Sequence, residues 1–297
     1  MAVWIYSTQP SFFNGRIRVE GMVIKLKLVK WFVFAALLLV LSACAGDKEK
    51  TKVDKESEQT SEVASEETVV VAPEENIEQP VEEEKQEILY ELNPANWTFK
   101  PIGDANPKVV LITIDDAPDK YAVEMATTLK ELNAPAIFFV NGHFLDSEKG
   151  KADLKAIQDM GFLIGNHTQT HANLKNSSEE QQKEEILKVN ETVEAITGEK
   201  PKFFRAPFGV NTDFSRALVQ SEGMLLMNWT YGYDWEKQYM DSAKLTDIML
   251  NTEFLTNGAN LLMHDRKWTA EALRGIVEGF REKGYDFIDP HTIKGIE

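Results

Sequence analysis

The chain has 297 residues, of which 43% are hydrophobic, and it carries a formal net charge of −16. The apolar content is enough for a folded core, while the acidic balance argues against a nucleic-acid-binding protein, which needs a basic face. The single cysteine excludes an internal disulfide and a zinc site built from several thiolates.

The N-terminal region has the pattern of an export signal. Three lysines between Met22 and Lys30 precede an unbroken apolar run, Trp31–Leu41, whose 11 residues are too few to span a bilayer as a helix. The run is followed by Ser42-Ala43-Cys44, which resembles the end of a bacterial lipoprotein signal, where the cysteine is lipidated and becomes the mature first residue. The alternative is a plain signal peptide with a chance cysteine.

These features divide the first part of the chain into three predicted segments. Residues 1–21 do not fit the start of a signal peptide and are expected to be a spurious extension before a true start at Met22. Residues 22–44 are the predicted lipoprotein signal. Residues 45–88 hold 15 acidic and 5 basic residues, a net of −10 that leaves −6 for the rest of the chain. Their composition buries too little apolar surface to fold, which predicts a disordered acidic linker.

Residues 89–297 alternate between strand and helix patterns. Strands are predicted at 109–114, 136–140, 162–164, 203–204, 224–229, 260–263 and 285–288. Helices are predicted at 121–132, 152–160, 178–197, 213–222, 242–255 and 269–283. This alternation predicts an α/β domain with a parallel sheet, open or closed into a barrel, and about 210 residues suit one barrel domain.

Polar residues follow several of the predicted strands directly. They are Asp115-Asp116, His167 with His171, Arg205, Asp234 and His264. The carboxyl ends of the strands in a parallel barrel converge on one face, which is where such barrels carry their catalytic residues. We therefore expect these side chains to meet around one pocket.

A metal site is one interpretation of the two histidines and the paired aspartates. On a helical turn, His167 and His171 would share a face and grip one ion, with a carboxylate as the third ligand. Asp115 and Asp116 would repel each other unless a cation lies near. A chance histidine pair, and an Asx-type turn stabilised by Pro118, remain the structural alternatives.

The chain from about residue 107 onward resembles the polysaccharide deacetylases with a NodB homology domain, carbohydrate esterase family 4. Five motifs occur in the order of that family, and together they cover about two-thirds of the chain. They are Thr113-Ile114-Asp115-Asp116, His167-Thr168-x-x-His171, Arg205-Ala206-Pro207-Phe208, Asp234-Trp235 and Leu262-Met263-His264. The resemblance implies a distorted (β/α)7 barrel as a single catalytic domain, residues 89–297.

The resemblance also implies a role for each motif residue. Asp116, His167 and His171 would hold one divalent ion, with zinc as the first candidate and cobalt, manganese or nickel as alternatives. Asp115 would be the general base, paired with Arg205, and His264 the general acid, oriented by Asp234. Substrate-binding roles fall to four residues: Phe208, whose backbone N–H would help to bind the oxyanion, Trp235 as a wall of the acetyl pocket, Leu262 and Pro207.

The function so implied is the removal of N-acetyl groups from a cell-wall polysaccharide that contains N-acetylglucosamine or N-acetylmuramic acid, such as peptidoglycan. The partners expected are this polymer and, through lipid on Cys44, the outer face of the bacterial membrane, with the protein a monomer. Amide hydrolysis needs an activated water, a base and an acid, and the motif residues supply these groups.

Three other functions stay open. The same residues would serve an O-acetyl esterase acting on a polysaccharide such as xylan. The barrel would be an inactive polysaccharide-binding protein if catalysis has been lost, and two histidines with one carboxylate also suit an iron oxygenase. Two departures from the family pattern, Ala117 in place of a glycine and Tyr231 in place of an earlier aspartate, bear on substrate preference more than on the metal site.

Overall fold

The structure, a computed structural model, describes residues 87–296 of the protein. The predicted extension, lipoprotein signal and nearly all of the predicted linker therefore lie outside the described residues. None of the helices within the described range is long and apolar enough to cross a membrane.

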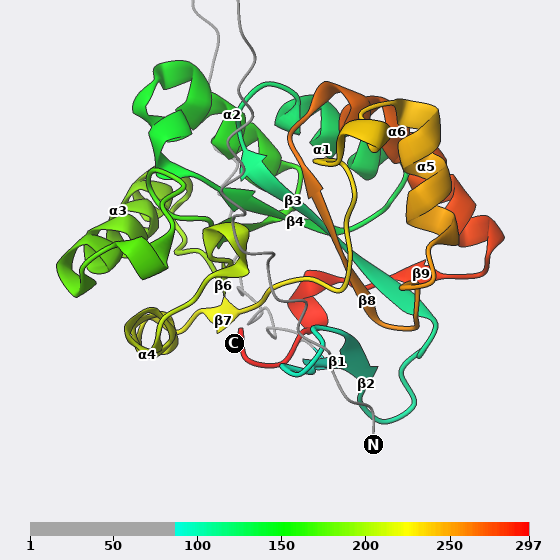
Figure 1. The fold of residues 1–297 in the computed structure, drawn as a ribbon, viewed down its shortest axis with the longest axis horizontal. Helices are drawn as coiled ribbons and strands as arrows, with labels where there is room; N and C mark the ends of the chain where they lie inside the picture. Colours follow the sequence, from blue (N-terminus) through cyan, green and yellow to red (C-terminus); the bar gives the residue numbers. More distant parts are fainter. Residues whose placement is uncertain (1–86, 297) are drawn as a thin grey trace, which may run out of the picture. The chain divides into compact units, whose positions relative to one another are not determined.

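The centre of the domain is a seven-stranded parallel sheet (Figure 1). Its strands are β3 (Val109–Ala117), β4 (Ala136–Val140), β5 (Leu163–Asn166), β6 (Phe203–Phe204), β7 (Leu225–Leu226), β8 (Ala259–His264) and β9 (Asp286–Phe287). They follow the order β7-β6-β5-β4-β3-β8, and β9 pairs with the start of β3. A parallel bridge between Tyr231 and Leu261 joins the segment after β7 to β8. The sheet thereby curls into the expected distorted barrel.

Helices cover the outer face of the sheet. They are α1 (Ala122–Glu131), α2 (Glu148–Asp159), α3 (Glu179–Thr197), α4 (Asp213–Ser221), α5 (Ser242–Asn251) and α6 (Lys267–Glu282). Neighbours in the series α5, α6, α1, α2, α3, α4 contact one another, so the helices form a continuous belt. In Figure 1, α3 and α4 flank the β6–β7 side of the sheet and α5 and α6 lie on the β8 side.

Both faces of the sheet are buried, which explains why its strands are continuous apolar runs. Val110, Ile112 and Ile114 of β3 belong to the core between the sheet and the helices. Val109 and Leu111 belong to a second core inside the barrel. Because side chains alternate along a strand, Asp115 is directed to the barrel interior like Val109 and Leu111.

Sequence reasoning missed one pair of strands. The antiparallel pair β1 (Tyr90–Leu92) and β2 (Phe99–Pro101) precedes the parallel sheet. Tyr90 and Phe99 pack into the core inside the barrel, and the Phe99 N–H donates to the Gly258 carbonyl at 2.7 Å. Each strand has three residues, too short for a clear alternation of apolar and polar side chains. The predicted strand at 224–229 is likewise only Leu225–Leu226.

The N-terminus of α1 is capped from another part of the chain. Its N-cap residue, Tyr121, makes no side-chain capping bond. The buried carboxylate of Asp265, just after β8, instead accepts hydrogen bonds from the backbone N–H groups of Asp119, Lys120 and Tyr121 at 2.7, 3.0 and 2.6 Å. This contact ties the loop after β3 to the end of β8.

We expect Asp265→Ala to lower the free energy of unfolding by about 2–4 kcal/mol, because several N–H groups would lose a charged acceptor. Urea denaturation would measure the loss. Asp241→Ala is the matched control, since Asp241 caps α5 on the surface with one bond and should cost only about 1 kcal/mol. Equal losses in the two variants would contradict the role of Asp265 in joining the loop after β3 to the end of β8.

Candidate active site

The two adjacent aspartates at the end of β3 both line one cavity, although they are neighbours in a strand. The register of β3 against β4 shifts between Ile114 and Ala117, which marks a β-bulge, and Asp116 has a left-handed φ of 60°. A bulge redirects a side chain that regular alternation would send to the other face. The bulge thus brings Asp116 to the same side as Asp115.

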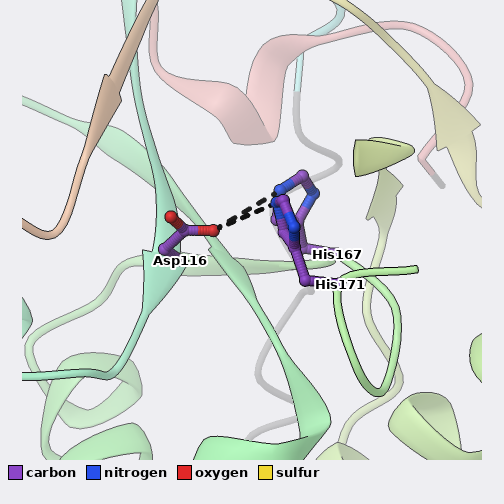
Figure 2. Close-up of side chains that lie close together, drawn as sticks. All are labelled: Asp116, His167 and His171. Atoms are coloured by element: carbon purple, nitrogen blue, oxygen red, sulfur yellow. Dashed lines mark ion pairs between the residues drawn. The ribbon is translucent and has the colours of Figure 1, made fainter. Parts of the chain in front are cut away.

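Asp116, His167 and His171 form a cluster whose nearest ligand atoms all lie within 4.8 Å of one another (Figure 2). Asp116 Oδ1 is 3.8 Å from His167 Nε2 and 3.5 Å from His171 Nε2. Figure 2 shows the two imidazoles directed toward the carboxylate from one side. Two imidazole nitrogens and a carboxylate oxygen suit zinc and several other divalent ions.

The two histidines lie in a loop after β5 and not on the helical turn that the spacing predicted. Thr168 and His171 have φ values of 69° and 60°, which interrupt any helix. Buried amides hold this loop instead. Asn141 Nδ2 donates to the carbonyl of His167 at 2.6 Å, and Asn166 Oδ1 accepts from the Thr168 N–H at 2.8 Å. The two imidazoles therefore converge through the path of the loop.

Hydrogen bonding selects one ring nitrogen of His167 for the cluster. His167 Nδ1 lies 2.7 Å from the Arg205 carbonyl oxygen, which can only accept, so Nδ1 carries a proton. Nε2 is then the atom that faces Asp116. Ligating histidines are commonly fixed in this way by a bond from the other nitrogen. His167 thus has the arrangement of a metal ligand.

The surroundings of His171 and Asp116 favour the protonation states in which these two residues bind a metal ion. Burial and the nearby His167 lower the pKa of His171 against the opposing effect of Asp116, which favours the neutral imidazole. Burial would raise the pKa of Asp116, but the charges of His264, His167, His171 and Arg266 outweigh it and lower that pKa. An ionised Asp116 carboxylate and a neutral His171 imidazole are the forms in which these two residues bind a cation.

Asp115 forms a fully buried ion pair with Arg205. Arg205 Nη1 donates to Asp115 Oδ1 at 2.6 Å and to Thr113 Oγ1 at 2.7 Å. Burial lowers the pKa of Arg205 and the charge of Asp115 opposes this. The guanidinium also lies 4.3 Å from the ring centre of Phe139. One oxygen of Asp115 is thereby occupied, and the other, Oδ2, is 3.5 Å from His167 Nε2.

His264, at the end of β8, is oriented by Asp234. Asp234 Oδ1 is 2.7 Å from His264 Nδ1, and Asp234 Oδ2 accepts from the His264 backbone N–H at 2.6 Å. Thr269 Oγ1 donates to Asp234 Oδ2 at 2.8 Å, and Trp268 Nε1 donates to the Asp234 backbone carbonyl at 2.8 Å. Burial alone would lower the pKa of His264, but the charge of Asp234 and its hydrogen bond outweigh burial and raise it. His264, held by Asp234, therefore has the arrangement of a positioned proton donor.

A cavity of about 430 Å³ brings these groups together. Nine of the residues that the sequence predicted as site residues line it: Asp115, Asp116, His167, His171, Phe208, Asp234, Trp235, Leu262 and His264. Asp234 is the most buried of them. Arg205 and Pro207 do not line the cavity; both are buried behind it. The Phe208 side chain is 63% exposed, and its ring lies edge-on to His171 with centroids 5.0 Å apart.

Four further residues line the cavity that sequence reasoning did not select: Trp229, Met240, Arg266 and Trp268. Arg266 and Trp268 follow His264 closely in the chain, so their position after the same strand was the available signal. Trp229 ends the segment predicted as a strand, and Met240 lies in a loop where no pattern marks it. Their arrangement depends on loop paths that spacing does not define.

The two departures from the family pattern are accommodated away from the cavity lining. Ala117 is buried, and the left-handed backbone of the bulge falls on Asp116, so position 117 does not require glycine. Tyr231 is buried in the barrel wall, where its hydroxyl donates to the Met249 carbonyl at 2.8 Å. Burial raises the pKa of Tyr231, which keeps it a neutral structural group.

Comparison with known proteins places the domain among deacetylases. The family described as polysaccharide deacetylase matches residues 102–227. A peptidoglycan-N-acetylglucosamine deacetylase of Bacillus cereus is 30% identical over 210 residues, which cover 67% of this chain and 93% of that protein.

Two solved structures extend the comparison to the fold. One, described as T48 deacetylase with substrate, is 28% identical with a TM-score of 0.57 and covers 63% of this chain and 90% of that chain. The other, a CE4 family pseudoenzyme from Bacillus anthracis, is 28% identical with a TM-score of 0.56 and covers 66% and 67% of the two chains. The structural likeness therefore extends both to a protein described as a deacetylase and to one described as a pseudoenzyme.

Proposed function

Because the chain belongs to the polysaccharide deacetylase family, we propose that it is a metal-dependent hydrolase of N-acetyl groups on cell-wall polysaccharide. The substrate is peptidoglycan or a related polymer that contains N-acetylglucosamine or N-acetylmuramic acid. The observation that carries this proposal is the pairing of Asp115 with Arg205 and of His264 with Asp234 at one cavity. Hydrolysis requires a base and an acid held in position beside the metal-ligand cluster of Asp116, His167 and His171, whereas binding of a polysaccharide alone does not.

Asp116, His167 and His171 would hold the divalent ion, with zinc as the first candidate. When bound, the ion would lower the pKa of water and polarise the acetyl carbonyl. The family is metal-dependent, and the nitrogen, nitrogen and oxygen donors of this cluster fit such an ion.

Asp115 acts as the general base in this mechanism. Its Oδ1 is held by Arg205, so Oδ2 is the oxygen that takes a proton from the attacking water as the new carbon–oxygen bond forms. His264 acts as the general acid. Asp234 holds Nδ1, which leaves Nε2 to protonate the nitrogen as the carbon–nitrogen bond breaks. The products are acetate and a free amine on the sugar.

The pairing of His264 with Asp234 predicts a shift in the pH profile. Asp234 raises the pKa of His264, so Asp234→Asn should lower it, and the protonated acid should be lost at lower pH. We expect the alkaline limb of the kcat/KM profile to move to lower pH and the maximum rate to fall by about 10²-fold or more. Asp241→Asn, a surface cap, should leave the profile unchanged. An unmoved alkaline limb in Asp234→Asn would assign the proton donor elsewhere.

The proposal is tested with metal-loaded protein and three substrates: peptidoglycan fragments, chito-oligosaccharides and O-acetylated xylan. Mass spectrometry before and after treatment should show loss of acetyl groups from the first or second, with matching release of acetate. Loss from xylan alone would instead support an O-acetyl esterase, whose leaving group depends less on His264. Binding without acetate release from any substrate would contradict the proposal and identify a binding protein.

We also propose that the enzyme works at the outer face of the bacterial membrane, held by lipid on Cys44. The support is the sequence alone, since Cys44 lies outside the described residues. Two acyl chains give stable anchoring where one is marginal. Intact-mass analysis of the membrane fraction should show a diacylated chain beginning at Cys44, and a soluble, unmodified chain would contradict the anchor.

A further inference from the structure

Arg266 contacts the cluster of Asp116, His167 and His171 but is not one of its three members. It lies two residues after His264, immediately before α6, and its side chain is 36% exposed. Arg266 Nη2 donates to Asp116 Oδ2 at 2.6 Å, and Arg266 Nη1 donates to the carbonyl of Asp265 at 2.9 Å. Among the described residues that line the cavity, Arg266 is the only arginine or lysine.

The two oxygens of Asp116 have different partners as a result. Oδ1 faces His167 and His171 at 3.8 and 3.5 Å, while Oδ2 is occupied by the guanidinium. A cation between the imidazoles would therefore meet one oxygen of the carboxylate. Arg266 is the only side-chain hydrogen-bond donor to Asp116 found among residues 87–296.

Asp116 needs this support more than an ordinary strand residue. It sits in the bulge of β3 with a φ of 60°, a conformation that costs a non-glycine residue about 1–3 kcal/mol and persists only where its surroundings hold it. Asp265 holds the backbone of residues 119–121 just beyond the bulge. Arg266 donates to the backbone carbonyl of the same Asp265, so its guanidinium links the Asp116 carboxylate to the segment that holds this loop.

We propose that Arg266 is a positioning residue of the metal site, which turns Asp116 so that Oδ1 faces the two imidazoles. This inference deepens the proposed function, since it concerns the same site. The planar guanidinium is suited to the task because it can hold two acceptors in fixed directions at once, whereas a lysine offers a point charge. Removing a group that hydrogen-bonds to a metal ligand commonly weakens metal affinity by about 10–100-fold.

Charge and orientation predict opposite effects of removing Arg266. The guanidinium is positive and would repel a cation, so if charge alone mattered its removal would tighten metal binding. If orientation of Asp116 dominates, removal weakens binding. Arg266→Gln removes both the positive charge and the planar guanidinium that binds two acceptors at once. Arg266→Lys keeps the charge but loses the guanidinium. Arg274→Gln is the matched control, because Arg274 is on α6 and pairs with Glu131 at the surface.

The experiment measures the affinity of the full-length protein for Co²⁺ by competition with a chromophoric chelator, and records the visible spectrum of bound Co²⁺. We expect Arg266→Gln to bind Co²⁺ about 10–100-fold more weakly than the wild type and to give an altered spectrum. Arg266→Lys should recover less than half of that loss on a logarithmic scale. Arg274→Gln should match the wild type. Unchanged or tighter binding by Arg266→Gln, or full recovery by Arg266→Lys, would overturn the proposal.

The affinity for Co²⁺ can be measured whether or not the protein deacetylates a polysaccharide. Tight Co²⁺ binding by the wild type without acetate release would reject deacetylation and still allow Arg266 to be tested. Far-ultraviolet circular dichroism of each metal-free variant reports whether it is folded. If Arg266→Gln fails to fold, the comparison of Arg266→Lys with the wild type decides, and equal affinities of these two proteins would overturn the positioning role.

Discussion

Asp115→Asn is expected to reduce the rate of deacetylation by about 10²–10⁴-fold while the protein still binds a divalent ion. The amide cannot take a proton from water, whereas Asp116, His167 and His171 remain in place. Acetate release would be measured with metal-loaded protein, beside a chelator competition that gives the metal affinity. Asp153→Asn, which removes a surface partner of Lys149 on α2, is the matched control and should keep the wild-type rate.

The stability of Asp115→Asn must be measured with its rate, because Arg205 is buried without other charged partners among the described residues. Asparagine keeps an oxygen that can accept from Arg205 Nη1, so the fold should persist with a reduced free energy of unfolding. Removing one member of a buried ion pair typically costs about 3–5 kcal/mol. A folded, metal-binding Asp115→Asn protein that deacetylates at the wild-type rate would overturn the assignment of the base.

Removal of the divalent ion should abolish deacetylation, and one equivalent of zinc or cobalt should restore it. The ion should also stabilise the fold, by about 2.7 kcal/mol when it is present at a hundred times its dissociation constant. Activity and thermal unfolding would be followed during dialysis against a chelator and after addition of metal. The expected result is a parallel loss and recovery of both properties.

Two histidine variants make the metal experiment specific to the cluster. His167→Ala should lose both the activity and the stabilisation by metal, because it removes a ligand. His143→Ala should respond like the wild type, since His143 is exposed and does not line the cavity. Full activity after exhaustive chelation, with metal analysis showing none bound, would contradict the metal-dependent mechanism.

Several features of the fold follow from local pattern. The strands at 109–117, 136–140 and 259–264 are apolar runs of β-branched, aromatic and large aliphatic residues, and long helices such as α3 show caps and an apolar stripe. Alternation of the two predicted a parallel sheet, which the structure confirms. The three-residue strands β1 and β2 escaped prediction because hydrogen bonding to distant segments, not their own pattern, holds them.

The residues that would gather at one face could be predicted from the sequence, because each strand of a parallel sheet delivers the residues that follow it to the same face. On this basis the sequence predicts that Asp115, His264 and the His167 loop lie near one another. The orientation of those side chains, by contrast, is set by tertiary contacts. The bulge that redirects Asp116, the loop that replaces a helical turn between the histidines, and the reach of Arg266 to Asp116 all depend on contacts between segments far apart in the chain. Spacing along the chain carries no record of such contacts.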